Sequence, residues 1–218
     1  MVDNPFDTIR GASDPLTLIP AGPPTGGLPI TAGLPLLGGL GVRIGRAGRS
    51  EAGEILTLQR AAYLSEALLY DDVRLPPLQQ TLAELEHEFT VPSSVVMTAL
   101  LGPRLVGSVR ATRAVEDPTV WRIGRLIVAP DLQRRGIGSR LLAAIEGAAP
   151  TDVETFTLFT GDRSEANLGL YRRRGYVESG RETVRPGLSL VHLDKPRRSG
   201  ESRRSLGVSD RETRRRVD

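Results

Sequence analysis

Between positions 42 and 195 the spacing of apolar residues switches between the helical period and the strand period. In residues 51–69 apolar positions recur every three or four residues, as on one helix face: Ile55, Leu58, Ala62, Leu68 and Leu69. In residues 105–115 apolar and polar positions alternate instead, which is typical of a strand. The two periods predict helices over 51–69, 78–89, 135–149 and 164–174, and strands over 42–47, 94–101, 105–115, 120–128, 155–160, 176–184 and 188–193.

Local signals indicate where these helices begin and end. Ser50 can cap the first helix, and Glu51 and Glu54 suit the positive end of its dipole. The inward stripe of the second helix consists of Leu78, Leu82, Leu85 and Phe89. Gly175 is placed to stop the last helix. The order β–α–α–β–β–β–α–β–α–β–β predicts an α/β (α+β) domain over 42–195.

The segment before this domain has a different composition. Residues 15–41 are apolar, but prolines and glycines interrupt them too often for a helix that crosses a membrane. The chain begins MVDNPFD, which lacks the basic region of a signal peptide. We therefore interpret residues 1–41 as a flexible Pro/Gly-rich extension, or as the product of a start codon placed too early, and expect a cytoplasmic protein.

The composition excludes several kinds of chemistry. The chain has 218 residues, no Cys and 2 His, so disulfides, thiolate metal sites and cysteine nucleophiles are absent. His87 and His192 lie too far apart in sequence to form a local metal motif. A zinc enzyme and a Ser–His–Asp hydrolase are therefore disfavoured, and no metal cofactor is expected.

The positive charge is concentrated at the end of the chain. The formal net charge is +3, and lysine occurs only at Lys195, so the basic residues are otherwise arginines. Residues 196–218 are rich in arginine and poor in large apolar residues, which predicts a disordered tail. A nucleic-acid-binding tail would have a similar composition, but no aromatic residue is interleaved for base stacking. The preference for arginine suits a GC-rich bacterial genome.

Residues 126–139, LIVAPDLQRRGIGS, carry the clearest chemical signal. A buried strand ends at Val128, and a helix begins within residues 135–138. Gly136 and Gly138 lack a Cβ where the chain enters the helix, so a ligand can approach the N–H groups of the first turn. These donors and the helix dipole favour an anion such as a pyrophosphate. An ordinary strand–turn–helix with a solvated basic corner would show the same glycines.

Two motifs resemble those of one family. The segment 126–139 is similar to motif A of the GCN5-related N-acetyltransferases (GNAT), and residues 167–176, NLGLYRRRGY, resemble their motif B. The resemblance covers about 42–195. It implies the GNAT fold, with a mixed, mostly antiparallel sheet of six or seven strands flanked by about four helices. It also implies acetyl-coenzyme A as co-substrate.

The resemblance assigns roles to individual positions. It implies that the pyrophosphate is held by Gln133, Arg134, Arg135, Gly136, Ile137, Gly138 and Ser139. Main-chain groups of Leu126, Ile127 and Val128 would pair with the pantetheine amides and polarise the acetyl carbonyl. Asn167 would contact the cofactor, and Tyr171 would protonate the leaving thiolate. Tyr171 could instead be a core residue, and Asn167 a residue of the first helical turn.

The general base is not assigned by the motifs. Members of the family often carry a carboxylate on the strand before motif A, but residues 120–126, VWRIGRL, contain no acid. Glu116 and Asp117 are expected at the wrong end of that strand. Further acids lie in the loop and helix expected beside the acceptor: Asp71, Asp72, Glu84, Glu86 and Glu88. Arg122 and Arg125 would suit an acceptor that bears a carboxylate or phosphate.

Three functions follow from these observations. The first is an acyl-coenzyme A:amine N-acyltransferase that acts on a small-molecule amine or a peptide by direct attack in a ternary complex. The second is a catalytically silent GNAT module that senses coenzyme A. The third, less favoured, is nucleic-acid binding through the tail. A monomer or homodimer without a membrane partner is expected.

Overall fold

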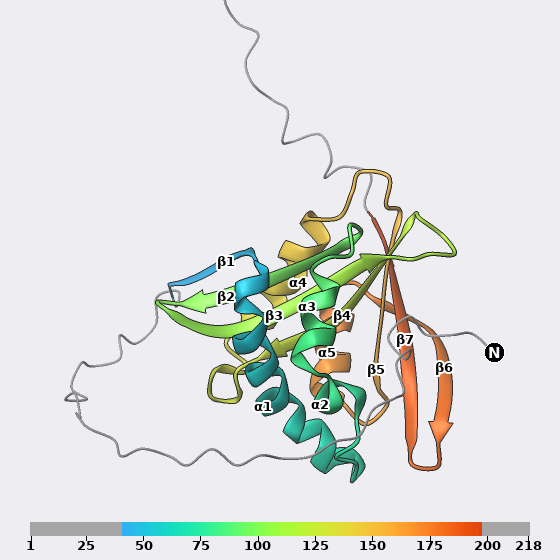
Figure 1. Ribbon diagram of the computed structural model, residues 1–218. Helices are drawn as coiled ribbons and strands as arrows, with labels where there is room; N and C mark the ends of the chain where they lie inside the picture. The colour runs from blue at the N-terminus through green and yellow to red at the C-terminus, as the bar shows by residue number, and fades with distance from the viewer. Residues whose placement is uncertain (1–40, 198–218) are drawn as a thin grey trace, which may run out of the picture. The chain divides into compact units, whose positions relative to one another are not determined.

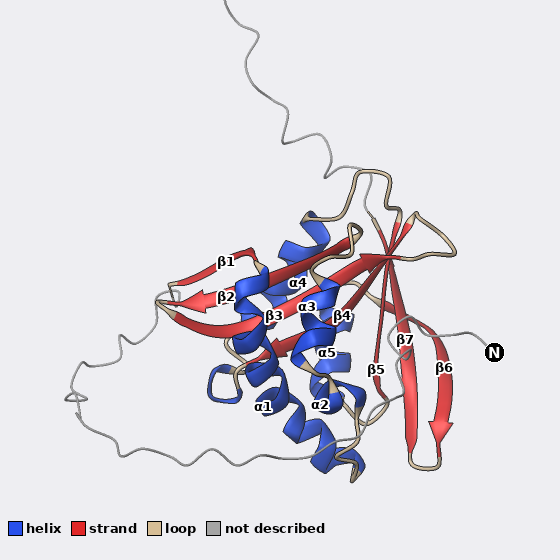
Figure 2. Cartoon of the chain, in the orientation of Figure 1, coloured by secondary structure: helices blue, strands red, loops and turns tan. Residues whose placement is uncertain are grey.

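A mixed, mostly antiparallel sheet of seven strands runs through residues 41–197, the part of the chain that the computed structural model describes (Figures 1 and 2). The strands lie in the order β1-β2-β3-β4-β5-β7-β6, and β4 and β5 are the parallel pair. The strands are β1 (Val42–Arg46), β2 (Ser94–Leu101), β3 (Arg104–Arg113), β4 (Val120–Val128), β5 (Thr155–Gly161), β6 (Val177–Arg185) and β7 (Leu188–Pro196). The helices are α1 (Ala52–Tyr70), α2 (Pro76–Gln79), α3 (Leu82–Glu88), α4 (Ile137–Gly147) and α5 (Glu165–Arg173).

The predicted architecture is confirmed in this region. The element order and the mixed sheet agree with the sequence prediction. The predicted extension over 1–41 and tail over 196–218 lie outside the described residues, apart from Gly41, Pro196 and Arg197. No helix within 41–197 is long and apolar enough to cross a membrane.

Successive side chains of β3 point to opposite faces of the sheet, and a different group of helices covers each face. Arg110 points to the face that carries α1, where its guanidinium donates to the Gln59 side chain. Gly107 points to the opposite face, where a Cβ would lie 2.8 Å from Cδ1 of Leu141 in α4. Helices α1, α2 and α3 therefore cover one face, whereas α4 packs on the other together with α5 (Figure 1).

The predicted helix over 78–89 is wrong in one respect, because two short helices form instead. Gln80 is extended, with ψ 131°, and ends α2. Thr81 then caps α3: its hydroxyl accepts from the Glu84 N–H (3.2 Å), and the Glu84 carboxylate accepts from the Thr81 N–H (2.7 Å). The break leaves Leu82 44% exposed, whereas Leu85 is buried.

The break is explained by a cluster of hydrogen-bonded polar side chains between the two helices and the sheet. The Gln80 side chain accepts hydrogen bonds from Gln59 (2.9 Å) and from Arg110 (3.2 Å), which is 3% exposed. Arg110 also forms a salt bridge with Glu88 of α3. Burial lowers the pKa of Arg110, and the neighbouring Glu88 carboxylate opposes that shift.

Helix α1 also differs from its prediction at both ends. Ser50 does not cap it: a 3-10 turn, η1 (Arg49–Glu51), precedes the helix, and the Glu51 carboxylate accepts from the Gly48 N–H (2.8 Å). Near the other end Leu68 is 77% exposed, while Ala67 and Tyr70 are buried. The buried side of α1 near its end is therefore formed by Ala67 and Tyr70, and not by Leu68 as predicted.

We predict that Gly107→Ala destabilises the fold. The added methyl would meet the Leu141 side chain at 2.8 Å and the Ile127 carbonyl oxygen at 3.1 Å, so strand or helix must shift. Overpacking of this kind lowers the free energy of unfolding by about 1–3 kcal/mol. Urea denaturation checks this, with Gly45→Ala as the control, since nothing lies within 4 Å of a Cβ at Gly45. Equal stability of the two variants would contradict the close packing of α4 on β3.

Candidate active site

The two parallel strands pair over a short stretch and then run apart. The register joins Val120–Arg122 to Thr155–Thr157, and further along β5 pairs with β7 on its other side. Figure 1 shows β4 and β5 diverging from their common end. Part of the main chain of β4 therefore faces away from any neighbouring strand among the described residues.

The alternation of hydrogen bonds identifies which residues face that open edge. The Ala129 N–H donates to the Val106 carbonyl (2.9 Å), so Ala129 and Ile127 direct their main-chain groups toward β3. Leu126 and Val128 occupy the alternate positions and direct theirs toward the open edge. Of the three strand residues that the motif suggested, Ile127 is thus engaged with β3 and is 4% exposed.

A bulge changes the direction of β4 just before this edge. The register with β3 shifts between Ser108 and Arg110, so that Arg125 and Leu126 together oppose a single residue of β3. Arg125 adopts a left-handed conformation with φ 52°. The bulge turns the end of β4 toward the loop that leads into α4.

That loop delivers the main chain to the start of α4. Arg134 (φ 60°) and Gly136 (φ 81°) are both left-handed, and the helix begins at Ile137, which is buried. No side chain within 41–197 caps this helix, so the N–H groups of its first turn are not engaged by a cap. Gln133, Arg134, Arg135 and Gly136 are exposed around them.

The loop has the properties of an anion site. A Cβ at Gly138 would lie 3.5 Å from Leu170 of α5 and 3.7 Å from Val128. Glycine at this position therefore leaves more room between α4 and α5 than a larger residue would. The helix N-terminus and the exposed Arg134 and Arg135 favour a negatively charged group. These residues fit a pyrophosphate.

A salt bridge braces the loop from outside. Both terminal nitrogens of Arg104 donate to the Asp131 carboxylate, each at 2.8 Å. These hydrogen bonds lower the pKa of Asp131, and the charges of Arg104 and Arg135 add to the effect. Asp131, the one acid in the loop, stays charged, and Arg104 compensates its charge, so Arg134 and Arg135 leave the loop with a net positive charge.

The two motif residues of α5 lie on its face toward α1. Tyr171 is 7% exposed, and its ring meets that of Tyr176 edge-on at 6.0 Å. Burial raises the pKa of Tyr171 above its ordinary value of 10.0, and the nearby acidic groups of Tyr63 and Glu66 raise it further. Its phenol therefore keeps its proton at neutral pH.

Glu66 of α1 is a residue of this region that sequence reasoning missed. Its carboxylate accepts hydrogen bonds from the Ser164 hydroxyl (2.5 Å) and from the Asn167 amide (3.3 Å). One turn further along α1, the Tyr70 hydroxyl accepts from the Arg163 N–H (2.7 Å). The signal that could have revealed this face is the helical spacing of Tyr63, Glu66 and Tyr70.

Most of the acids considered from the sequence are engaged elsewhere. Asp72 binds Arg185 (2.6 Å), and Glu116 binds Arg122 (2.8 Å) near the start of β4. Arg122, which the sequence suggested for an acceptor bearing a carboxylate or phosphate, is thus engaged by Glu116. Asp117 accepts from Thr119, Glu84 caps α3, Glu86 binds Arg49 and Glu88 binds Arg110, whereas Asp71 is exposed.

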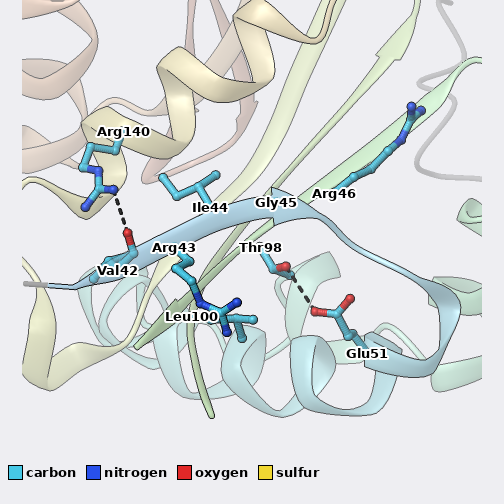
Figure 3. Close-up of a pocket in the computed structure, with 9 residues that line it drawn as sticks. All are labelled: Val42, Arg43, Ile44, Gly45, Arg46, Glu51, Thr98, Leu100 and Arg140. Atoms are coloured by element: carbon cyan, nitrogen blue, oxygen red, sulfur yellow. Dashed lines mark hydrogen bonds between the residues drawn. The ribbon is translucent and has the colours of Figure 1, made fainter. Parts of the chain in front are cut away.

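A separate hollow lies along the edge strand β1, and sequence reasoning did not anticipate it. Its volume is about 510 Å³, and three arginines, Arg43, Arg46 and Arg140, line it beside Glu51. Figure 3 shows Arg43 pointing to the side of Leu100 and Arg140 reaching the start of β1, where it binds the Val42 carbonyl (2.7 Å).

Comparisons with known proteins agree with this geometry. A family model described as an acetyltransferase (GNAT) domain matches residues 70–196. The S-(2-succino)cysteine N-acetyltransferase of Bacillus subtilis (strain 168) is 32% identical over 81 residues, which are 36% of this chain and 47% of that protein. The chain thus spans about half the length of this curated relative.

Solved structures share the fold. A GNAT-family acetyltransferase from Streptococcus pneumoniae is 18% identical, with a TM-score of 0.59 over 71% of this chain and 99% of that one. The ribosomal-protein-S18-alanine N-acetyltransferase from Escherichia coli is 14% identical, with a TM-score of 0.58 over 71% and 93%. The PaiA N-acetyltransferase from Thermoplasma acidophilum, in complex with coenzyme A, is 12% identical, with a TM-score of 0.56 over 69% and 97%.

We predict that the fold loses stability in alkali because of its buried phenols. Burial raises the pKa of Tyr70, Tyr171 and Tyr176 above 10.0, so the folded chain holds protons that the unfolded chain releases. The stabilisation is complete below pH 10 and declines above it. Urea denaturation at about pH 9 and about pH 11 measures the loss, which Tyr171→Phe should reduce. A loss as large in Tyr171→Phe would contradict the assignment.

Proposed function

The chain belongs to the GNAT acetyltransferase family, and we propose that it transfers an acetyl group from acetyl-coenzyme A to an amine of a small molecule or peptide. The observation that carries this proposal is that an open strand edge and an uncapped helix start follow each other along the chain. The open edge of β4 at Leu126 and Val128 leads directly into the uncapped start of α4 at Gly136.

The residues on this path suit different parts of coenzyme A. Gln133, Arg134, Arg135, Gly136, Ile137, Gly138 and Ser139 would surround the pyrophosphate, with the first-turn N–H groups as donors. Main-chain groups of Leu126 and Val128 would pair with the pantetheine amides, as an added strand does. When bound, the co-substrate supplies the acetyl thioester. A main-chain N–H at the β4 edge would donate to its carbonyl oxygen.

Tyr171 is the proposed proton donor to the departing sulfur. Its phenol is protonated at neutral pH, the form that a donor requires, while burial raises its pKa and makes it a weaker acid than a free tyrosine. Asn167, one helical turn earlier, would contact the co-substrate, although its amide here donates to Glu66 (3.3 Å) and Thr160 (3.4 Å). Binding would therefore require Asn167 to share or exchange these partners.

The acceptor can be identified by release of free thiol from acetyl-coenzyme A. The names of the similar proteins suggest the panel: S-(2-succino)cysteine, free amino acids and a peptide with an N-terminal alanine. Thiol release with one member distinguishes an enzyme from a silent coenzyme A sensor. Binding of acetyl-coenzyme A without release across the panel would favour the sensor.

We predict that Gly136→Glu abolishes the rise in melting temperature that acetyl-coenzyme A should cause. The carboxylate would stand beside the pyrophosphate and repel it, whereas ligand binding otherwise stabilises the fold by mass action. Gly175→Glu is a matched control, because Gly175 is also left-handed (φ 87°) with no atom within 4 Å of a Cβ. Its shift should persist. No shift in the unaltered protein at millimolar acetyl-coenzyme A would refute the co-substrate.

We also predict that Tyr171→Phe slows turnover while acetyl-coenzyme A still raises the melting temperature. Loss of a general acid reduces kcat by about 100-fold or more. Tyr176→Phe is the control: it also removes a buried hydroxyl, which here donates to Glu146 (2.9 Å), but it should leave kcat within a few-fold. Equal kcat in the unaltered protein and Tyr171→Phe would exclude the acid role.

A further inference from the structure

Helices α1 and α5 meet in an antiparallel row of polar contacts beside the diverging strands. Tyr70 binds the turn before α5 through Arg163, and Glu66 binds Ser164 and Asn167. The charge of Glu66 also acts on Tyr171, further along α5. The row therefore places a carboxylate in contact with Asn167, which the proposed function assigns to the co-substrate, and near enough to Tyr171 for its charge to raise the pKa of that phenol.

The partners of Glu66 differ from those of the other acids in the region. Ser164 and Asn167 are neutral donors, and each uses one lone pair of the carboxylate, which leaves further lone pairs for a proton. Asp72, Glu88 and Glu116 are instead bound to arginines, whose positive charge compensates that of the carboxylate. Of these carboxylates, Glu66 is the one that is held by neutral donors, so its oxygens can also receive a proton from an amine.

We propose that Glu66 accepts the proton of the acceptor amine during acetyl transfer. This inference rests on the proposed function. The amine nitrogen forms a bond to the acetyl carbon while the carbon–sulfur bond breaks. The nitrogen gives its proton to a Glu66 oxygen, and Tyr171 gives its proton to the sulfur. Glu66 then returns the proton to the Tyr171 oxygen, directly or through water, so both residues regain their starting state.

Other titratable groups stand on the elements around Glu66. Tyr63 and Tyr70 lie on the same helix, and Asp162, Arg163, Glu165 and Tyr171 lie on the turn and helix that it contacts. The Asp162 carboxylate accepts from the Tyr70 hydroxyl (3.3 Å) before α5 begins, and Glu165 is exposed. The phenols are acids, and the guanidinium groups hold their protons at neutral pH. The phenols and guanidinium groups are not suited to take a proton from an amine at neutral pH, whereas a carboxylate is, and Glu66 is the carboxylate that contacts Asn167.

The test is chemical rescue of Glu66→Ala. Initial rates are measured with acetyl-coenzyme A and S-(2-succino)cysteine, or with the panel member that gives the highest rate, with and without sodium formate. We expect kcat to fall about 100-fold or more, and formate to restore part of it by entering the vacated space as a base. The melting-temperature shift with acetyl-coenzyme A should persist.

Two controls separate proton transfer from support of the fold. Ser164→Ala removes the 2.5 Å hydrogen bond but keeps the carboxylate, so its smaller loss of rate should not respond to formate. Glu86→Ala removes an acid that binds the exposed Arg49, and its rate should be unchanged and insensitive to formate. If Glu66→Ala does not fold, Glu66→Gln keeps the volume and must show the same loss of kcat.

The outcomes distinguish this inference from the proposed function. Thiol release by the unaltered protein together with a kcat for Glu66→Gln within threefold of it would overturn the role of Glu66 alone. A loss of rate in Glu66→Ala without any response to formate would also overturn it, in favour of a purely structural role. No thiol release by the unaltered protein with any panel member would overturn the proposed function itself.

Discussion

The divergence of β4 from β5 is the constraint on which the rest of this structure depends. Pairing between the two strands ends at Arg122 and Thr157, after which β5 pairs with β7 alone. Main-chain groups that would otherwise complete a sheet are then directed to an open edge at Leu126 and Val128. The bulge at Arg125 turns this edge toward the start of α4, so a single extended ligand can meet strand and helix together.

Helices stabilise the opening from both faces. On one side α4 is fixed by Ile137 and Leu141, which pack close to Gly107 of β3. On the other side α1 reaches α5 through Glu66 and Tyr70, and Gly161 admits the Tyr70 hydroxyl, which would lie 2.2 Å from a Cβ there. A neutral hydrogen bond such as that of Tyr70 contributes about 0.5–1.5 kcal/mol, and one to a charged group such as Glu66 about 1.5–3 kcal/mol. The contacts hold Asn167 and Tyr171 in fixed positions beside the diverging strands.

The buried side chain of Arg110 and its acceptors determine where the helices on the α1 face of the sheet are interrupted. Arg110 is buried in the sheet, and the cost of burying its charge is offset there by acceptors for its two terminal nitrogens. Gln59, Gln80 and Glu88 supply the acceptors from three different helices or their ends. Gln80 must leave the helical conformation to do so, which separates α2 from α3. The same group fixes α1, and therefore Glu66, relative to β3.

The sequence by itself determined the element order, the glycine-bearing entry to α4 and the two motif residues of α5, because periodicity and backbone freedom are local properties. It did not predict the break at Gln80, since a buried arginine on a distant strand selects that conformation. It also left the general base unassigned, because a search along β4 cannot find a carboxylate on α1. Only the tertiary structure shows that Glu66 contacts Asn167, which lies 101 residues away in sequence. Only it shows that the main-chain groups of Leu126 and Val128 face the open edge, whereas those of Ile127 face β3. Both outcomes depend on which strands stop pairing and which helices meet there, and such long-range choices leave no local pattern in the sequence.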